Sequence, residues 1–389
     1  MVSDFQYEKF QSKKPRVVVI QELGYFLDRE LVEGCTNFDV MPWYFAKTSD
    51  PIKNFLEIIN QFKPDFILSV NLKGCDQGGV LFDLIENLKV PLAIWFLDNP
   101  DYLLREFKGE LPVNTNVYIW DSSWKIGLQS RLNRPVNFLP LATSHFFEKN
   151  SNFDSNGPTS FVGSSMAQGV KQIESELSDF NLGRRDLWPH FTHLKSSLRI
   201  TDIKPQINSY LSLKLTDYSG KLVTICDELV RYWATYISRV NMVKVARCAE
   251  IYGDQGWQAT LSITPDSKLF GPLNYYDELP EHFSQAGIHL NFTHFQMPMG
   301  VNQRLFDVIN AGGVLLTDQQ ADLIQLFPRL KDWTYQEVSE IPDLIHKIHS
   351  SLEYSNLLSD IQKEIREKHY YHHRLTVIYD QMKSLYIKD

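Results

Sequence analysis

The stretch Met299–Asp318, MGVNQRLFDVINAGGVLLTD, decides how the second half of this chain is expected to fold. Its pattern predicts a loop, a short amphipathic helix, a Gly-Gly break and a buried apolar strand. Arg304 and Asp307 lie one helical turn apart, so both side chains can face one ligand. A helix N-terminus with glycine and arginine suits a phosphate, and a carboxylate one turn later suits sugar hydroxyls. The stretch therefore indicates a nucleotide-sugar site.

The start of this predicted helix carries more polar groups than a helix cap requires. Its residues are Gly300, Asn302, Gln303 and Arg304. A capped helix followed by an ordinary core strand is the simpler alternative, but a cap needs only one Ser, Asp or Asn. The planar guanidinium of Arg304 can instead present a fork to a diphosphate. We therefore favour a binding site.

Length and charge restrict the class of protein. A chain of 389 residues exceeds the usual size of one hydrophobic core, so two domains are expected. Hydrophobic residues make up 43% of the chain and aromatic residues 13%, as in a well-packed globular protein. The chain has 39 basic and 47 acidic residues and no basic run, which argues against a nucleic-acid partner. A local basic funnel for a phosphorylated ligand remains compatible with this balance.

Cysteine usage and the apolar runs indicate a cytoplasmic protein. The four cysteines are scattered without a CxxC pair, which is typical of a reduced compartment and disfavours a zinc site. The polar N-terminus lacks the apolar core of a signal peptide, and no run approaches the ~20 apolar residues of a spanning helix. We expect a soluble protein that could still work peripherally at a membrane surface.

Residues 1–150 predict a first Rossmann-like domain. The expected strands are Arg16–Gln21, Asp65–Asn71, Pro91–Leu97, Val117–Trp120 and Val136–Leu139. Short apolar runs separated by helical patterns indicate a parallel sheet covered on both faces. Polar residues cluster where each run ends, which is where open α/β sheets bind ligands.

Residues 151–350 predict a second Rossmann-like domain after a polar linker, Asn150–Thr159. The expected strands are Ser160–Gly163, Glu250–Tyr252, Lys268–Phe270, Ile288–Phe292 and Gly313–Thr317. Residues 168–249 form a largely helical segment of unassigned role. Residues 351–389 predict helices that pack back across the domains. The fold class expected from these patterns is α/β, with two Rossmann-like halves and a cleft between them.

Short motifs in both halves resemble those of one known family. Within Phe270–Phe327 they are Gly271, Leu279-Pro280, Ile288-His289-Leu290-Asn291, Arg304-Leu305-Phe306-Asp307, Gly312-Gly313 and Leu315-Leu316-Thr317-Asp318. Elsewhere they are Trp95-Phe96-Leu97-Asp98-Asn99-Pro100, Trp120-Asp121, Phe138-Leu139-Pro140-Leu141-Ala142, Phe161-Val162-Gly163-Ser164, His369-Tyr370 and His373-Arg374. In type and order these motifs resemble the CgeB-like (spore-maturation type) glycosyltransferases. The resemblance does not extend to the helical segment 168–249.

The resemblance implies a GT-B fold, in which the first domain binds the acceptor and the second binds the nucleotide-sugar donor. By position, Phe270, Gly271 and Leu273 would hold the base through their backbone, and Asp307 would bind the ribose, where the family usually has Glu. Arg304 and backbone amides near Gly300 would neutralise the leaving diphosphate. Asn302, Gln303, Gly163 and Ser164 would complete the donor site. Such folds usually need no metal, and the chain has no Asp-x-Asp triplet, so neither metal nor cofactor is expected.

Two departures from the family pattern affect the expected chemistry. Many retaining enzymes of this fold carry an acid eight positions before the ribose-binding acid, and Met299 stands there in this chain. A retaining reaction is therefore unsupported. The loop Gly163–Met166 lacks the arginine that is common nearby in the family. Either Arg304 carries more of that charge or a basic residue of the helical segment reaches in.

An inverting reaction needs a general base that removes the proton of the acceptor hydroxyl. The candidates follow predicted strands of the first domain and are Asp98, Glu22 and Asp121. We favour Asp98, which follows a buried aromatic strand and precedes Asn99-Pro100, and we rank Glu22 second. For each acid the alternative is a residue that merely caps a turn. Asn71, Gly74, Gly78 and Gly79 form another polar strand end that could line the acceptor side or be a plain loop.

One group of histidines and one pair of tyrosines can each be interpreted in two ways. His369, His372 and His373 have a spacing that could bind a metal, but no carboxylate or cysteine pattern accompanies them, so packing is the favoured role. Tyr275 and Tyr276 lie near Gly271 and could stack on a base or belong to the core.

The sequence therefore predicts a glycosyltransferase that moves a sugar from a nucleoside-diphosphate sugar to an acceptor hydroxyl. The expected acceptor is a polysaccharide, a lipid-linked glycan or a protein. The alternatives are an epimerase or hydrolase of the same fold and a catalytically inactive binding or scaffold protein. A nicotinamide dehydrogenase is disfavoured, because the first strand leads into Glu22-Leu23-Gly24-Tyr25 and not into a G-x-G-x-x-G turn.

Overall fold

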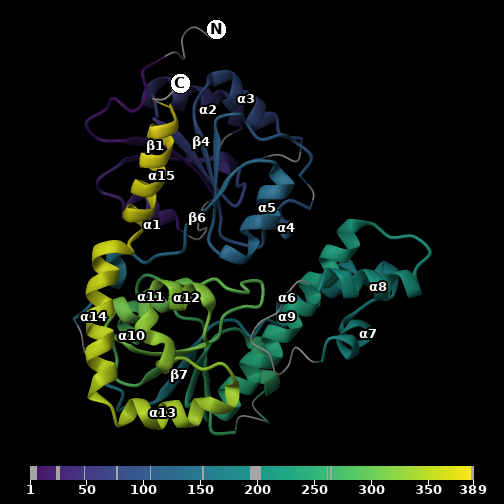
Figure 1. Ribbon diagram of the computed structural model, residues 1–389, viewed down its shortest axis with the longest axis vertical. Coiled ribbons are helices and arrows are strands. Elements are labelled where there is room, and N and C mark those ends of the chain that lie inside the picture. The colour runs from purple at the N-terminus through teal and green to yellow at the C-terminus, as the bar shows by residue number, and fades with distance from the viewer. Residues whose placement is uncertain are drawn as a thin grey trace. The chain divides into compact units, whose positions relative to one another are not determined.

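The structure is a computed structural model that describes residues 7–22, 27–47, 49–75, 78–105, 107–150, 153–192, 203–260, 262 and 265–386. The chain divides into two compact units (Figure 1). Unit 1 consists of Met1–His145 with Lys368–Asp389, and unit 2 consists of Phe146–Glu367. Each unit is built around one parallel sheet.

The sheet of unit 1 has the strand order β2-β1-β3-β4-β5-β6, and its neighbouring strands pair in parallel. Its strands are β1 (Arg16–Gln21), β2 (Asp39–Tyr44), β3 (Phe66–Val70), β4 (Leu92–Phe96), β5 (Thr115–Ile119) and β6 (Val136–Phe138). Its helices are α1 (Asp28–Val32), α2 (Pro51–Phe62), α3 (Val80–Leu88), α4 (Pro100–Leu103) and α5 (Lys125–Leu132). Every residue of β3 and β4 is buried, as expected of central strands covered on both faces.

One strand of this sheet, β2, was not predicted. It lies at the edge of the sheet, contains Pro42, and has mostly half-exposed or exposed side chains. A proline is tolerated in an edge strand because the missing N–H can face away from the sheet. The continuous apolar signal that identifies a central strand is therefore absent from this edge.

The sheet of unit 2 has the strand order β11-β10-β7-β8-β9, again with parallel neighbours. Its strands are β7 (Thr159–Val162), β8 (Glu250–Tyr252), β9 (Lys268–Phe270), β10 (Ile288–Asn291) and β11 (Val314–Thr317). The sequence predicted a strand at each of these places. The stretch Met299–Asp318 folds as expected, with α11 (Gln303–Asn310) leading into β11.

A group of helices projects from the sheet of unit 2 (Figure 1). Its members are α6 (Ala167–Glu176), α7 (Arg184–Leu187), α8 (Lys204–Lys214) and the long α9 (Gly220–Val245). The helix α9 packs against α6, α7 and α8 and returns toward β8, so it connects the projecting group to the sheet. The remaining helices of this unit are α10 (Leu279–Phe283), α12 (Ala321–Leu326), α13 (Ile341–His349) and α14 (Leu352–Lys368).

The last helix, α15 (Tyr371–Tyr386), belongs to unit 1 although it follows unit 2 in sequence. Arg374 donates to the carbonyl oxygens of Pro140 (2.8 Å) and Leu141 (3.0 Å), and the rings of Tyr371 and Trp95 meet at 6.1 Å. The predicted return of the C-terminal helices is therefore found in α15. The neighbouring α14 lies with unit 2, where Gln362 donates to the carbonyl of Asn310.

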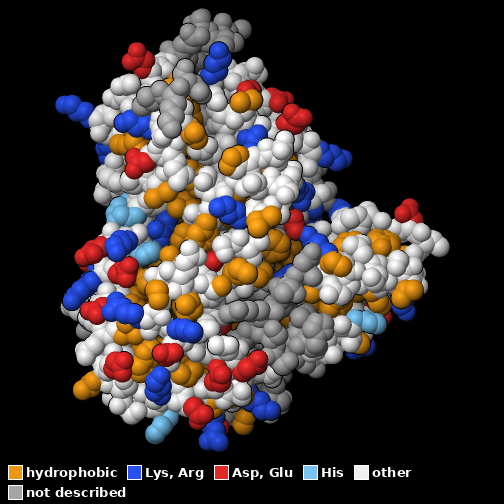
Figure 2. Space-filling model, viewed as in Figure 1, with side chains coloured by type: hydrophobic (Ala, Val, Ile, Leu, Met, Phe, Trp, Pro, Cys, Tyr) orange, Lys and Arg blue, Asp and Glu red, His pale blue; other side chains and the backbone are white. Residues whose placement is uncertain are grey.

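The surface and the helices bear on the expected environment of the protein. On the face drawn in Figure 2, acidic and basic side chains are interspersed with one another. Within the described part of the chain, no helix combines the length and the apolar character that a bilayer crossing requires.

Candidate functional site

Asn291, the last residue of β10, is the centre of a hydrogen-bond network at the carboxyl end of the second sheet. Its side-chain oxygen accepts from Arg304 Nη1 (3.0 Å) and Asn302 Nδ2 (2.9 Å). Its side-chain nitrogen donates to Thr317 Oγ1 at the end of β11 (2.8 Å). This buried amide therefore ties β10, β11 and the start of α11 together. Sequence reasoning missed its role, although a polar residue that ends a buried strand is a usable signal.

The side chain of Asn302 does not cap α11. Asn302 occupies the N-cap position, but its side chain makes no capping hydrogen bond and instead exchanges hydrogen bonds with Asn291. The simpler alternative, in which the polar residues serve only to cap the helix, therefore does not describe this residue.

The half-buried Arg304 projects from the first turn of α11 toward the end of β7. Its guanidinium carbon lies 5.5 Å from the centre of the Phe161 ring, within the range of a cation–π contact. A Cβ atom at Gly163 would come within 3.2 Å of Arg304 Nη2, so glycine at this position allows the close approach. Burial lowers the pKa of Arg304 to about 10 and nearby Asp307 opposes that shift, so the group remains protonated at neutral pH.

The loop that follows β7 is fixed from within the unit. Trp257 Nε1 donates to the carbonyl of Gly163 (2.9 Å). Asp254 accepts from the hydroxyl of Ser164 (2.7 Å) and from the amide (2.8 Å) and hydroxyl (2.6 Å) of Ser165. Burial alone would raise the pKa of Asp254, but the hydrogen bonds from Ser165 and Ser164 outweigh it and hold the pKa below its usual value.

A second arginine, Arg239 of α9, lies beside the same loop. Its Nη1 donates to the carbonyl of Ser164 (2.7 Å) and its Nη2 to the carbonyl of Phe292 (3.3 Å). Its guanidinium carbon lies 5.8 Å from the centre of the Phe161 ring. Burial, followed by the charge of Arg304, lowers the pKa of Arg239 to about 9. The sequence predicted that either Arg304 or a basic residue of the helical segment would supply positive charge near this loop. In the structure both Arg304 and Arg239, a residue of that segment, lie close to it.

Asp307, expected to bind the ribose, lies beneath Tyr275. Its side chain is 2% exposed, and the Tyr275 hydroxyl donates to Asp307 Oδ2 (3.0 Å) while accepting from Gln303 Nε2. The Tyr275 ring packs on Phe147 at 5.0 Å. The ribose contact stays a prediction, and it requires the Tyr275 hydroxyl to move.

The loop expected to hold the base begins at an exposed edge of the sheet. Phe270, at the end of β9, is 40% exposed and stacks on Tyr252, with ring centres 4.7 Å apart and planes 14° apart. Gly271 is exposed, with no neighbour within 4 Å of an added Cβ, and Leu273 is half-buried. Gly300 is buried before α11. The roles assigned to these residues stay predictions.

In unit 1, the favoured general base Asp98 is held by Asn71. Asn71 Nδ2 donates to Asp98 Oδ2 (2.7 Å), and Asn71 Oδ1 accepts from the amides of Leu97 (2.7 Å) and Asp98 (3.2 Å). Asn71 and Leu72 have φ values of 53° and 58°, a left-handed conformation that is unfavourable for Leu72. The loop after β3 therefore adopts a strained shape that places the Asn71 amide against the end of β4.

The other two acids differ from Asp98. Glu22 is exposed and forms an ion pair with Lys73 Nζ (2.5 Å), while Leu23 and Gly24 lie outside the described residues. Asp121 is fully buried and accepts from the amide (2.8 Å) and hydroxyl (2.5 Å) of Ser123, so it caps the 3-10 turn Ser122–Trp124. The capping alternative thus describes Asp121.

The histidine group near the C-terminus contains an arginine. Arg374 Nη2 lies 2.8 Å from His369 Nδ1, and His373 Nδ1 accepts from the amide of Tyr370 (3.1 Å). Burial lowers the pKa of His369 to about 3 and that of His373 to about 4, with Arg374 contributing to both shifts. A fixed cation is unsuited to a metal site. No cluster of three metal-ligating side chains occurs among the residues that the structure describes.

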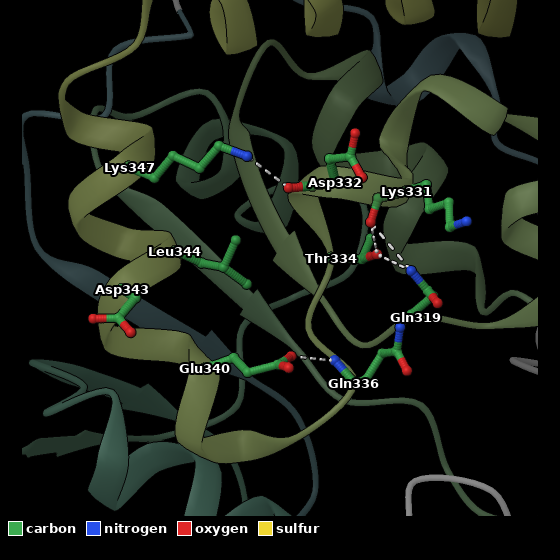
Figure 3. A pocket seen from close by; sticks show the side chains of 9 residues that line it. All are labelled: Gln319, Lys331, Asp332, Thr334, Gln336, Glu340, Asp343, Leu344 and Lys347. Atoms are coloured by element: carbon green, nitrogen blue, oxygen red, sulfur yellow. Dashed lines mark hydrogen bonds between the residues drawn. The ribbon is translucent and has the colours of Figure 1, made fainter.

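A polar hollow of about 360 Å³ lies beside α13 in unit 2 (Figure 3). Lys347 Nζ donates to the carbonyl of Asp332 (2.9 Å) at its rim, and Gln319 Nε2 donates to Thr334 Oγ1 (3.1 Å). Polar groups that line the hollow therefore form hydrogen bonds with one another. The residues of the Arg304 network do not line this hollow.

Comparisons with known proteins bear on the fold and the enzyme class. Residues 239–380 match a family described as glycosyl transferase-like. A search of curated proteins finds no match. Similar solved structures include T4 phage β-glucosyltransferase, at 11% identity over 96% of this chain and 98% of that chain, with a TM-score of 0.45. They also include WaaG, a glycosyltransferase involved in lipopolysaccharide biosynthesis, at 8% identity over 94% and 99% of the two chains (TM-score 0.46). An α,α-trehalose-phosphate synthase (UDP-forming) from Burkholderia vietnamiensis has 9% identity over 96% and 100% (TM-score 0.43).

The predicted fold class is confirmed by the chain's own architecture, since two Rossmann-like parallel sheets and a C-terminal helix that returns to the first unit make up a GT-B fold. The family match confirms the predicted enzyme class, glycosyltransferase, for the region that holds α11 and Arg304. It does not name the CgeB-like family, so that finer assignment stays a prediction.

Proposed function

We propose that this protein transfers a sugar from a nucleoside-diphosphate sugar to an acceptor hydroxyl of a polysaccharide, a lipid-linked glycan or a protein, without a metal ion. The observation that carries the proposal is the setting of Arg304. Its guanidinium remains protonated, projects from the first turn of α11, and has no carboxylate at ion-pair distance in the described part of the chain. A fixed cation of this kind suits a diphosphate.

The reaction creates negative charge where Arg304 lies. The acceptor oxygen forms a bond to the anomeric carbon, and the bond between that carbon and the phosphate oxygen breaks. Its electron pair stays on the diphosphate, which leaves with an added negative charge. Arg304 and the loop at Gly163 and Ser164 stabilise that charge without having to reorganise. The acceptor proton passes to the carboxylate of Asp98, which Asn71 orients.

The remaining donor contacts follow from the position of each residue. Phe270, Gly271 and Leu273 bind the base at the edge of the sheet. Asn302 and Gln303 support the start of α11 through Asn291 and Tyr275. Asp307 reaches the ribose when the Tyr275 hydroxyl swings away, and Gly300 supplies backbone near the phosphates. In this assignment Glu22 is a second candidate base.

A thermal-shift screen with nucleoside diphosphates and their sugars tests the proposal. A ligand that binds the native state raises the melting temperature, so one base should stand out for the wild-type protein. Arg304→Ala should abolish that shift and lower transfer by about 10²–10³-fold, because a charged donor to the leaving group is lost. Transfer should persist in excess chelator.

The control variant is Arg329→Ala, which removes an exposed arginine that pairs with Asp360 in the same unit. It should retain both the shift and the activity. Wild-type turnover in Arg304→Ala would contradict the proposal. Free sugar without glycosylated acceptor would favour a hydrolase or epimerase, and binding without any turnover would favour an inactive scaffold.

A further inference from the structure

We propose that the projecting helices of unit 2 are a working part of the donor site, because α9 supplies a second guanidinium, Arg239, that positions the diphosphate loop. The inference rests on the proposed function and assigns a role to the helical segment. Arg239 acts as a positioning residue: it fixes the backbone that meets the ligand and adds positive charge beside it.

The helix α9 holds the chain that leaves β10 over three successive turns. Arg231 Nη1 donates to the carbonyl of Phe295 (3.0 Å), and the Phe295 amide donates to Thr235 Oγ1 (3.1 Å). Arg239 Nη2 then reaches the carbonyl of Phe292 (3.3 Å). The spacing of four residues places these side chains on one face of the helix. This face of α9 therefore holds the chain segment that follows β10.

The two buried arginines of α9 differ in how their charge is balanced. Arg231 pairs with Asp227 at 2.9 Å, and both side chains are almost completely buried. Arg239 is 6% exposed and has no carboxylate at ion-pair distance among the described residues, and its Nε has no hydrogen-bond partner there. The carboxylates of Asp318 and Asp254 favour the charged form of Arg239 only from beyond ion-pair distance, so this buried charge is only partly compensated and its position needs a reason beyond packing.

The nearest guanidinium makes this imbalance larger. Arg239 and Arg304 both lie against the ring of Phe161, at 5.8 Å and 5.5 Å from its centre. The two positive groups therefore disfavour one another in the protein without ligand. A ligand with two phosphate groups carries more negative charge than one with a single phosphate group, and its charge extends over a greater length, so it can act on both guanidinium groups. The pair of arginines thus fits a diphosphate better than a monophosphate.

Two side chains hold the peptide groups on either side of Ser164, and Arg239 holds the one that follows it. The carbonyl of Gly163 is held by Trp257, and the carbonyl of Ser164 is held by Arg239. In a planar trans peptide the N–H points opposite to the C=O, so the Ser164 amide is directed away from Trp257. Ser164 is exposed, and its amide makes no hydrogen bond to the rest of the described chain. The amide is thus available to a phosphate oxygen.

The test compares the affinity of the full-length protein for a nucleoside diphosphate with its affinity for the corresponding monophosphate, by titration calorimetry. Arg239→Gln should weaken diphosphate binding about tenfold or more, the size expected for a charge-assisted contact, and should affect the monophosphate less. Arg239→Lys keeps the charge but cannot hold both carbonyls, and should lose diphosphate affinity several-fold.

The matched control is Thr235→Val, one turn earlier on α9, which removes an anchor of the same chain segment but no charge. It should keep the wild-type ratio of the two affinities. A wild-type ratio in Arg239→Lys and in folded Arg239→Gln would overturn the inference. If diphosphate binding is lost in Arg304→Ala but unchanged in the Arg239 variants, the inference fails and the proposed function stands. If the wild-type protein binds no nucleoside diphosphate, both fail.

Discussion

The carboxyl ends of the two sheets differ in the side chains proposed to act there: arginines in the second unit and carboxylates in the first. At the end of the second sheet the guanidinium groups of Arg239 and Arg304 lie against the ring of Phe161. At the end of the first sheet the carboxylate of Asp98 accepts a hydrogen bond from Asn71, and that of Glu22 forms an ion pair with Lys73. Both ends are the usual ligand-binding edges of open α/β sheets. In the proposed function the same architecture therefore binds an anion in one unit and supplies a proton acceptor in the other.

The largest effect on turnover is expected when the carboxylate of Asp98 in the first unit is removed. Asp98→Asn should lower turnover by about 10²–10⁴-fold, the usual contribution of a general base, while donor binding in the second unit stays unchanged. Steady-state kinetics and calorimetry on the same variant separate the two effects. Asp101→Asn, which changes an acid three residues later that pairs with Arg131, is the control and should remain active. A loss of donor affinity in Asp98→Asn would contradict this role, because it would show that Asp98 contributes to donor binding.

A smaller effect, on donor affinity, is expected from Asp254, which holds the loop beside Arg239 and Arg304. Asp254→Asn weakens the hydrogen bonds from Ser164 and Ser165, so donor affinity should fall about tenfold as the loop loosens. The pKa of Asp254 in the folded protein lies below its unfolded value of about 3.9. The stabilisation is therefore complete above pH ~4 and is lost as the pH falls through the folded pKa.

Melting temperatures measured from pH 3 to pH 7 check this pH dependence. The gap between wild type and Asp254→Asn should be constant at neutral pH and should close in acid. A gap that widens as the pH falls would refute the assigned role of this carboxylate.

The smallest change should come from Glu22. Its carboxylate is exposed and already paired with Lys73, so Glu22→Gln should alter turnover less than twofold if Asp98 is the base, since exposed ion pairs contribute little. The measurement is kcat with saturating donor and acceptor. A hundredfold decrease of kcat in Glu22→Gln, together with an active Asp98→Asn, would make Glu22 the general base in place of Asp98.

The parts of the fold that local pattern determines could be predicted from the sequence. Buried strands such as β3 and β4 carry continuous apolar runs, and the stretch around α11 and β11 has a clear helix-to-strand change of period. The edge strand β2 lacks that signal because its side chains are only partly covered.

The details of the candidate site depend on contacts between distant segments, which pattern does not encode. Arg239 meets Ser164 across 75 positions, and Tyr275 covers Asp307 across 32. A partial signal for Arg239 existed: polar residues recur every fourth position on the buried face of α9, at Asp227, Arg231, Thr235 and Arg239. The cap that Asp121 forms on the turn Ser122–Trp124 is likewise visible only in the structure, and the choice of general base stays a prediction.

The return of α15 to the first unit has a consequence for how the protein is made. Unit 1 is discontinuous in sequence, and its last piece, including Tyr371 against Trp95, is translated only after the whole of unit 2. At ordinary elongation rates the interval is on the order of tens of seconds. During that interval the side of the nascent first sheet that α15 will cover is bare, while the second unit can already close its core. The first unit therefore begins synthesis before the second unit but can complete its core only after the second unit has been made.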